Sequence, residues 1–351
     1  MKNEKILLIG SGLLMGLIAA LLVVFGNPVN MGFCLACFIR DTVGALGLHR
    51  AEAVQYARPE IVGLILGACI LAFANKEFSP RGGSAPLTRF VLGFFAMVGC
   101  LVFLGCPFRV VLRLAGGDFN AIFGFLGFAC GIGVGVVFLN KGYSLNRTYK
   151  QTKLEGLTLP IIAASILAIL VFVPSLLIFT EAGKGPGALH APLLISLLAG
   201  LAVGAVAQKS RMCMVGGVRD IILFKDFKLI SGFISIFVAC LIVNLIVGKF
   251  KPGFAEQPVA HTDAVFNFLG MLLAGYACTL LGGCPLRQLI MAGEGNIDSA
   301  IAVLGLAVGA AFCHNFGLAA SPKGVPLNAK IALAIGFVVV TVIALMNTKK
   351  E

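Results

Sequence analysis

Charged residues are scarce in this sequence, and their scarcity excludes most classes of soluble protein. Asp, Glu, Lys and Arg make up 12% of the 351 residues, whereas 59% are hydrophobic. Soluble globular domains average about 25% charged and roughly 45–50% apolar residues. The composition therefore predicts a protein embedded in a lipid bilayer.

Acidic residues are the scarcer charge, with 15 Asp and Glu against 27 Lys and Arg, a net charge of +12. The basic residues gather in short stretches between apolar runs, which is typical of a membrane-topology signal. It is not typical of a nucleic-acid surface, so nucleic acid is not an expected partner. The sequence also has no Gly-x4-Gly-Lys-Ser/Thr loop, and we predict neither a nucleotide nor another cofactor.

Histidine is rare as well. The four histidines are His49, His190, His261 and His314, and none adjoins the repeated cysteines described below. Because thiolate and thioether groups suit Cu(I) or Zn, Met212-Cys213-Met214 leaves metal transport as a weaker alternative. We predict no resident metal site.

Long apolar runs dominate what is present, and about 20 such residues suffice to cross a bilayer. Ten runs of this kind occur, at 5–25, 59–75, 87–105, 119–140, 157–180, 191–208, 229–249, 264–282, 298–317 and 327–347. The first resembles a signal peptide, but no clear cleavage site leads to a soluble domain, and we interpret it as a retained helix. Four shorter apolar segments begin at or next to a cysteine, at 33–48, 106–116, 212–224 and 284–295. We predict an all-α polytopic membrane protein with about ten transmembrane helices and four short re-entrant helices.

The pattern Gly-Cys-Pro-x-Arg occurs twice, starting at Gly105 and at Gly283. The offset along the chain that carries Cys106 onto Cys284 also carries Cys100 onto Cys278. A second pattern, Cys-x5-Arg-Asp, starts at Cys34 and recurs at Cys213, at almost the same offset. Two motifs repeated in the same order indicate a duplicated architecture.

The predicted spans give the two copies opposite orientations. Five spanning runs separate equivalent points, and an odd number turns the second copy upside down, as in many transporters with inverted repeats. We predict a first repeat at 1–140, a linker with a connecting helix at 141–190, a second repeat at 191–320 and a C-terminal helix at 321–351. Most Lys and Arg residues fall on one face, which predicts that this face is cytoplasmic and that both termini lie there.

Proline in the repeated motif has a direct structural meaning. Proline is favoured at the first position of a helix, so Gly-Cys-Pro predicts that Cys106 and Cys284 are helix N-caps. A helix N-terminus presents free N–H groups and a partial positive charge to an anion. Arg109 and Arg287 follow one turn later and stay charged even in a poorly hydrated site. We therefore predict that both motifs attract an anion to a sulfur atom.

The Cys-x5-Arg-Asp motifs supply charge at membrane depth, where an unpaired charge is costly. We predict structural charge pairs between Arg40 and Asp41 and between Arg219 and Asp220. Cys34-x2-Cys37 alone suggests a redox pair, but the second copy has Gly216 in place of Cys37. The remaining cysteines, Cys69, Cys130, Cys240 and Cys313, lie in apolar runs and are interpreted as small packing residues.

These motifs resemble the YeeE/YedE family of bacterial inner-membrane sulfur-compound transporters over nearly the whole chain, and most closely its YedE group of candidate selenium transporters. The resemblance implies a transporter, not an enzyme, for thiosulfate or a related sulfur or selenium anion. It implies a relay through Cys34, Cys106 and Cys284, with Cys213 as a fourth candidate and Arg109 and Arg287 at the mouths. It also implies a multi-pass protein of the inner membrane and a soluble sulfur-carrier partner at the cytoplasmic face.

Two alternatives remain open from the sequence. A membrane thiol-disulfide oxidoreductase would use Cys34 and Cys37, and serine at Cys37 would abolish it while leaving a relay largely working. A structural subunit of a sulfur-handling enzyme would show no flux. If transport is coupled to protons, Asp41, Asp220 and Glu294 are the carboxylates nearest the short elements.

Overall fold

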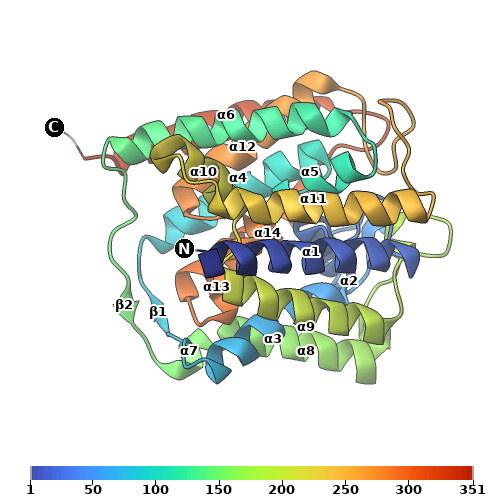
Figure 1. Cartoon of the computed structure of the whole chain (residues 1–351), viewed down its shortest axis with the longest axis horizontal. Helices are drawn as coiled ribbons and strands as arrows, with labels where there is room; N and C mark the ends of the chain where they lie inside the picture. The colour runs from blue at the N-terminus through green and yellow to red at the C-terminus, as the bar shows by residue number, and fades with distance from the viewer. Residues whose placement is uncertain (1, 350–351) are drawn as a thin grey trace.

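The computed structural model describes residues 2–349, and its elements follow the predicted order closely (Figure 1). The first half contains α1 (Lys2–Val24), α2 (Leu35–Ala45), η1 (Glu52–Val54), α3 (Pro59–Ala74), α4 (Pro86–Phe103), α5 (Pro107–Ala115) and α6 (Asn120–Asn140). The second half contains α9 (Leu193–Ser210), α10 (Met214–Phe224), α11 (Lys228–Ile246), α12 (Ala264–Leu281), α13 (Pro285–Gly293) and α14 (Ile297–Asn315). The predicted all-α architecture is confirmed.

The connecting region and the C-terminal end lie outside these two halves. They contain α7 (Lys153–Gly156), α8 (Thr158–Phe172), η2 (Pro174–Leu176), η3 (Pro186–Ala188) and α15 (Leu327–Met346). The short strands β1 (Arg81–Gly82) and β2 (Tyr149–Lys150) pair antiparallel beside α7. The predicted boundaries of the repeats and the linker stay predictions.

Within residues 2–349, nine helices are long and apolar enough to cross a membrane. The tenth predicted span, at 157–180, is shorter than expected, because α8 ends at Phe172. Pro174 explains this end, since the residue before a proline is disfavoured in the α conformation, and Val173 has φ −138° and ψ 56°.

The two halves pack by the same rules. Helix α6 lies against α12 as α14 lies against α4, and α3 lies against α9 as α11 lies against α1. Helix α5 likewise contacts α11, as its counterpart α13 contacts α3. Each contact is reproduced when every helix is replaced by its counterpart in the other half.

Glycines allow the close approach of these helices. An added Cβ at Gly127 of α6 would lie 2.0 Å from the carbonyl oxygen of Phe268. At Gly305 of α14, the equivalent of Gly127, it would lie 2.2 Å from that of Phe90, which is the equivalent of Phe268. Small residues serve this purpose in membranes, where helices associate by packing rather than by the hydrophobic effect. The duplicated glycines show that the internal repeat extends into the core.

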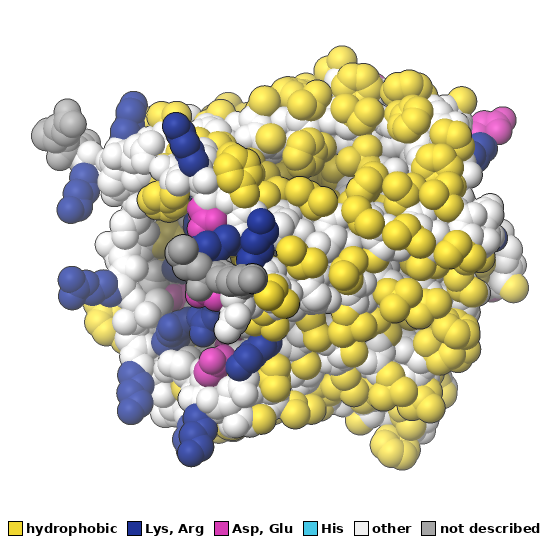
Figure 2. Space-filling view, in the orientation of Figure 1, with side chains coloured by type: hydrophobic (Ala, Val, Ile, Leu, Met, Phe, Trp, Pro, Cys, Tyr) yellow, Lys and Arg dark blue, Asp and Glu magenta, His cyan; other side chains and the backbone are white. Residues whose placement is uncertain are grey.

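The short helices enter from opposite ends of the molecule. In Figure 1, α2 and α5 lie toward the right end, whereas α10 and α13 lie at the left end, where α1 begins. Figure 2 shows Lys and Arg gathered at that left end and a broad apolar surface over the rest of the visible face. Exposed apolar side chains such as Leu17 and Ile242 belong to this surface. The short helices thus lie at opposite ends, as an inverted repeat predicts, and the flanks are apolar.

Candidate functional site

A cysteine stands at the N-cap of each of the four short helices. Cys34 precedes α2, Cys106 precedes α5, Cys213 precedes α10 and Cys284 precedes α13, each with extended backbone angles. Pro107 and Pro285 occupy the first helical position, as the sequence predicts. All four cysteines are buried. Four helix N-termini therefore present sulfur atoms to the interior of the protein.

The four cysteines meet as two pairs. The Sγ atoms of Cys34 and Cys106 lie 3.9 Å apart. The thiols of Cys213 and Cys284, their equivalents in the second half, also interact, and Cys213 accepts a hydrogen bond from the Gly216 amide at 3.4 Å. Each pair joins the two repeated motifs of one half.

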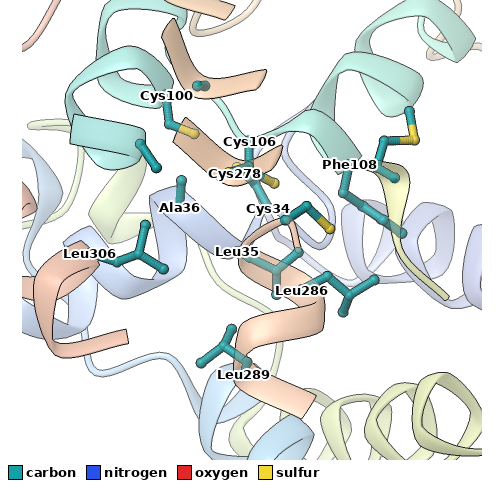
Figure 3. Packing of buried hydrophobic residues seen from close by; sticks show 14 of the residues in the cluster. Cys34, Leu35, Ala36, Cys100, Cys106, Phe108, Cys278, Leu286, Leu289 and Leu306 are labelled. Atoms are coloured by element: carbon teal, nitrogen blue, oxygen red, sulfur yellow. The ribbon is translucent and has the colours of Figure 1, made fainter. Parts of the chain in front are cut away.

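The centre of the protein between the pairs is apolar. Figure 3 shows Leu35, which follows Cys34, close to Leu286, which lies two positions after Cys284. Both leucines are fully buried. Leu35 and Leu286 therefore belong to the buried apolar core next to the Cys34 and Cys106 sulfurs.

Arg109 is buried beside the first pair and is held by carbonyl groups. Its Nε donates to the carbonyl oxygen of Asn30 at 2.9 Å, its Nη2 donates to that of Val259 at 3.2 Å, and its Nη1 donates to that of Leu104. Within the described residues no carboxylate lies within ion-pairing distance of Arg109. The guanidinium is thus hydrogen-bonded but its charge is not neutralised.

The three carbonyl groups around Arg109 come from unusual backbone conformations. Asn30, Leu104 and Val259 have φ values of 61°, 63° and 51°, in the left-handed region that residues other than glycine rarely adopt. Such conformations cost about 1–3 kcal/mol each and are concentrated at functional sites. The three residues whose carbonyl groups bind the Arg109 guanidinium, in three separate segments, are therefore all in strained backbone conformations.

The glycine of each Gly-Cys-Pro-x-Arg motif lies under the arginine side chain. A Cβ at Gly105 would be 2.6 Å from Cδ of Arg109, and one at Gly283 would be 3.0 Å from Cγ of Arg287. The arginine folds back over the glycine toward the helix N-terminus. The motif is therefore a single unit in which glycine makes room for the cation next to the cysteine.

Arg287 has a different partner from Arg109. Its Nη1 lies 3.3 Å from Oε1 of Glu294, and its Nη2 lies 3.5 Å from Oε2. Both side chains are about one tenth exposed, at 12% and 11%. The sequence motif does not distinguish the two arginines, but the structure pairs only Arg287 with a carboxylate.

Cys37 lies between Arg109 and the first cysteine pair. Its Sγ accepts from Nη1 of Arg109 at 3.5 Å and lies 3.8 Å from the carbonyl oxygen of Leu104. It also interacts with the thiol of Cys34, one turn away on α2. The structure therefore adds Cys37 to the group formed by Cys34 and Cys106.

The charge pairs of the Cys-x5-Arg-Asp motifs form within each motif. Arg40 lies 2.6 Å from Asp41, and Arg219 lies 2.8 Å from Asp220. In the first half Arg58, which sequence reasoning missed, lies 2.8 Å from the other oxygen of Asp41. Asp41 therefore sits between two buried guanidinium groups, leaving a net positive charge.

A cavity lies beside Arg40 of this charge cluster. It has a volume of about 350 Å³, and its lining includes Arg40, Leu104, Val259 and His314. Leu104 and Val259 also supply carbonyl groups to Arg109. The cavity therefore lies against the Arg109 site, and no sequence motif predicted it.

Sequence reasoning also left two central cysteines without a role. Cys100 of α4 and Cys278 of α12 are equivalent positions of the two halves, and both are buried near Cys34 and Cys106 (Figure 3). The signal was present in the repeat, because the offset that relates Cys106 to Cys284 also relates these two. Cys100 and Cys278 therefore add two sulfur atoms to the buried cysteines around Cys34 and Cys106.

Comparison with known proteins finds a similarity in the second half of the chain. A family model described as "Sulphur transport" matches residues 209–348, which include Cys213, Cys284 and Arg287. Residues 209–348 are therefore similar to the sulphur transport family. The first half lies outside this match, but the repeat gives it the same motifs.

Two curated proteins that are similar to part of this chain are named thiosulfate transporter TsuA. The protein from Spirochaeta thermophila is 31% identical over 114 residues, which is 32% of this chain and 34% of the relative. The protein from Escherichia coli is 31% identical over 115 residues, which is 32% of this chain and 31% of the relative. The similarity therefore spans about a third of each relative.

Proposed function

We propose that this protein transports a small sulfur-containing anion of the thiosulfate type across the inner membrane, and that it is a transporter rather than an enzyme. The observation that carries the proposal is the pairing of four N-cap cysteines, with an uncompensated guanidinium beside the outer pair. The sulphur transport family and the two relatives named thiosulfate transporters support it. Neither relative is named as an oxidoreductase, so nothing in the comparisons favours a dithiol enzyme at Cys34 and Cys37.

The anion first meets positive charge. It enters the cavity beside Arg40 and is drawn toward Arg109, because a buried cation without a counter-ion attracts an anion strongly in a medium of low dielectric constant. The carbonyl groups around Arg109 fix the guanidinium without cancelling its charge. Arg109 is thus the selectivity element at the outer end.

The thiols then pass the anion inward. A thiol is a weak hydrogen-bond donor, and conduction requires sites that bind well enough to admit an ion and weakly enough to release it. The anion moves from Cys106 to Cys34, crosses the apolar core at Leu35 and Leu286, and leaves past Cys284. Cys213, whose thiol interacts with that of Cys284, is a fourth member of this relay. No covalent bond forms at any step.

The orientation of the path follows from charge. The end that carries α10, α13 and the start of α1 bears the gathered Lys and Arg residues (Figure 2), and the positive-inside rule assigns such an end to the cytoplasm. The cavity beside Arg40 then faces outward, and both termini are cytoplasmic. A soluble sulfur-carrier protein at the inner end stays a prediction from the family resemblance.

A selenium-containing anion is the second candidate substrate. Cys37, which contacts Arg109, adds a polarisable sulfur to the outer site, and such a site suits a larger and softer anion. Competition between selenosulfate or selenite and labelled thiosulfate would rank the substrates.

Uptake of radiolabelled thiosulfate into liposomes tests the proposal. The purified protein should give uptake above that of empty liposomes, and Cys106→Ala and Cys284→Ala should each lower it at least tenfold. Cys130→Ala is the matched control, because Cys130 is exposed on the flank of α6. Wild-type uptake no greater than that of empty liposomes would contradict transport and favour a structural subunit. Full activity of both variants would contradict the cysteine path.

A further inference from the structure

The two arginines of the repeated motif occupy equivalent positions but have opposite electrostatic surroundings. Arg109 donates to carbonyl groups and to the sulfur of Cys37, and none of these acceptors is a carboxylate. Arg287 faces both oxygens of Glu294 at 3.3 and 3.5 Å. Within the described part of the chain, only the inner arginine has an anionic partner.

Packing around Arg109 explains why it has no carboxylate partner. The offset that relates Arg287 to Arg109 also relates Glu294 to Gly116 in the first half. A Cβ at Gly116 would lie 1.9 Å from Oδ1 of Asn30, so no carboxylate side chain fits there. Asn30 in turn supplies one of the carbonyl groups that hold Arg109. The Arg109 site therefore has no room for a counterpart of Glu294, the carboxylate that pairs with Arg287.

Glu294 is fixed at the position where a leaving anion would contact Arg287. It caps the C-terminus of α13, and its carbonyl oxygen accepts a hydrogen bond from the Ser79 amide at 3.0 Å. Arg287 lies in the first turn of the same helix, one turn from Cys284. The Glu294 carboxylate and an anion at Cys284 would thus compete for one guanidinium.

We propose that Glu294 is an internal competitor that weakens anion binding at the inner end and so speeds release. The inference rests on the proposed function and deepens it. An anion arriving at Cys284 must displace the carboxylate from Arg287, whereas an anion arriving at Arg109 displaces no charged group. The asymmetry cannot drive uphill transport, but it determines where on the path the anion is held.

The proposal predicts an asymmetry in wild-type kinetics. In a passive pathway Vmax/KM must be equal in both directions, since the two fluxes balance at equal concentrations. A weaker inner site therefore appears as a higher KM at the inner face, accompanied by a higher Vmax for efflux. Radiolabelled thiosulfate fluxes in liposomes with the protein inserted in one orientation measure both faces. Equal KM values at the two faces would overturn the proposal.

Glu294→Gln tests the residue itself, because it removes the charge and keeps the shape. We expect KM at the inner face to fall roughly three- to tenfold, with a matching fall in Vmax. Glu294→Asp, whose shorter side chain draws the carboxylate back from Arg287, should change KM in the same direction and serves if the first variant does not fold. Glu77→Gln is the matched control, since Glu77 pairs with Arg211 on the same side but outside the cysteine path.

The outcomes separate this proposal from the proposed function. If the wild type transports thiosulfate and the Glu294 variants keep its inner-face KM, the competitor role is wrong and transport stands. If the wild type does not transport thiosulfate, the proposed function fails and this inference fails with it.

Discussion

The Sγ atoms of Cys34 and Cys106 lie 3.9 Å apart, although 72 residues separate them in the chain. The contact exists because two short helices, α2 and α5, both begin at the centre of the protein with their N-termini facing each other. Both N-termini bring a partial positive charge to the same place. This geometry supports the proposal that the pair is a site for an anion.

A double-mutant cycle tests whether the two cysteines act as one unit. Cys34→Ala and Cys106→Ala should each lower thiosulfate uptake at least tenfold, and the double variant should be no worse than the more impaired single variant. Residues that act as a unit give strongly non-additive effects. Initial uptake rates in liposomes give the four values. Additive losses would show two independent sites.

Gly105→Ala should damage the outer site without a change in charge. The added Cβ would lie 2.6 Å from Cδ of Arg109, and the guanidinium cannot move without leaving its three carbonyl partners. We expect KM for thiosulfate to rise about tenfold, since misplacement by about 1 Å costs up to 10²-fold in well-oriented sites.

Gly133→Ala is the control for this substitution, because an added Cβ at Gly133 meets no atom within 4 Å. It should leave KM unchanged. A Gly105→Ala protein with wild-type KM would show that Arg109 does not need its observed position.

The repeat supplies a matched pair of carboxylates for a stability measurement. Asp41→Asn leaves two buried guanidinium groups, Arg40 and Arg58, without their anion, and breaking a buried pair in this way costs about 3–5 kcal/mol. Asp220→Asn breaks a pair whose arginine is 34% exposed, and this should cost less than about 1 kcal/mol. Thermal unfolding in detergent compares them. Equal losses would show that the second buried partner of Asp41, Arg58, adds nothing to the cost of losing the carboxylate.

Stability should also depend on pH through His261, which lies in the loop before α12. Burial lowers the pKa of His261, and its Nε2 contacts the carbonyl oxygen of Val102 at 2.8 Å. The unfolded chain then binds a proton at a higher pH than the folded protein does. The contribution of neutral, buried His261 to the free energy of unfolding is fully present above the unfolded pKa of about 6.5. It is lost as the pH falls below that value.

His261→Gln keeps a donor near Val102 but does not titrate. The melting temperature of the wild type should fall more steeply between pH 7 and pH 5 than that of the variant. Identical slopes would show that His261 does not control this dependence.

The sequence predicted the spans and the short helices well, because apolar runs and the prolines after Cys106 and Cys284 are local signals. It could not predict which helix N-termini meet, since the contact between Cys34 and Cys106 depends on how α2 and α5 are packed. It missed Arg58 because no motif links this arginine to Asp41. It also treated Arg109 and Arg287 as equal, because their motifs are the same and their partners come from elsewhere in the fold.

The most direct test of the cysteine path is to locate a bound anion by anomalous scattering from selenium. Crystals of the protein soaked with selenosulfate should show a selenium peak beside the Sγ atoms of Cys34 and Cys106 and within reach of Arg109, and Arg109→Gln should remove it. Selenium bound only on the lipid-facing flank, or unchanged in the Arg109 variant, would contradict the account.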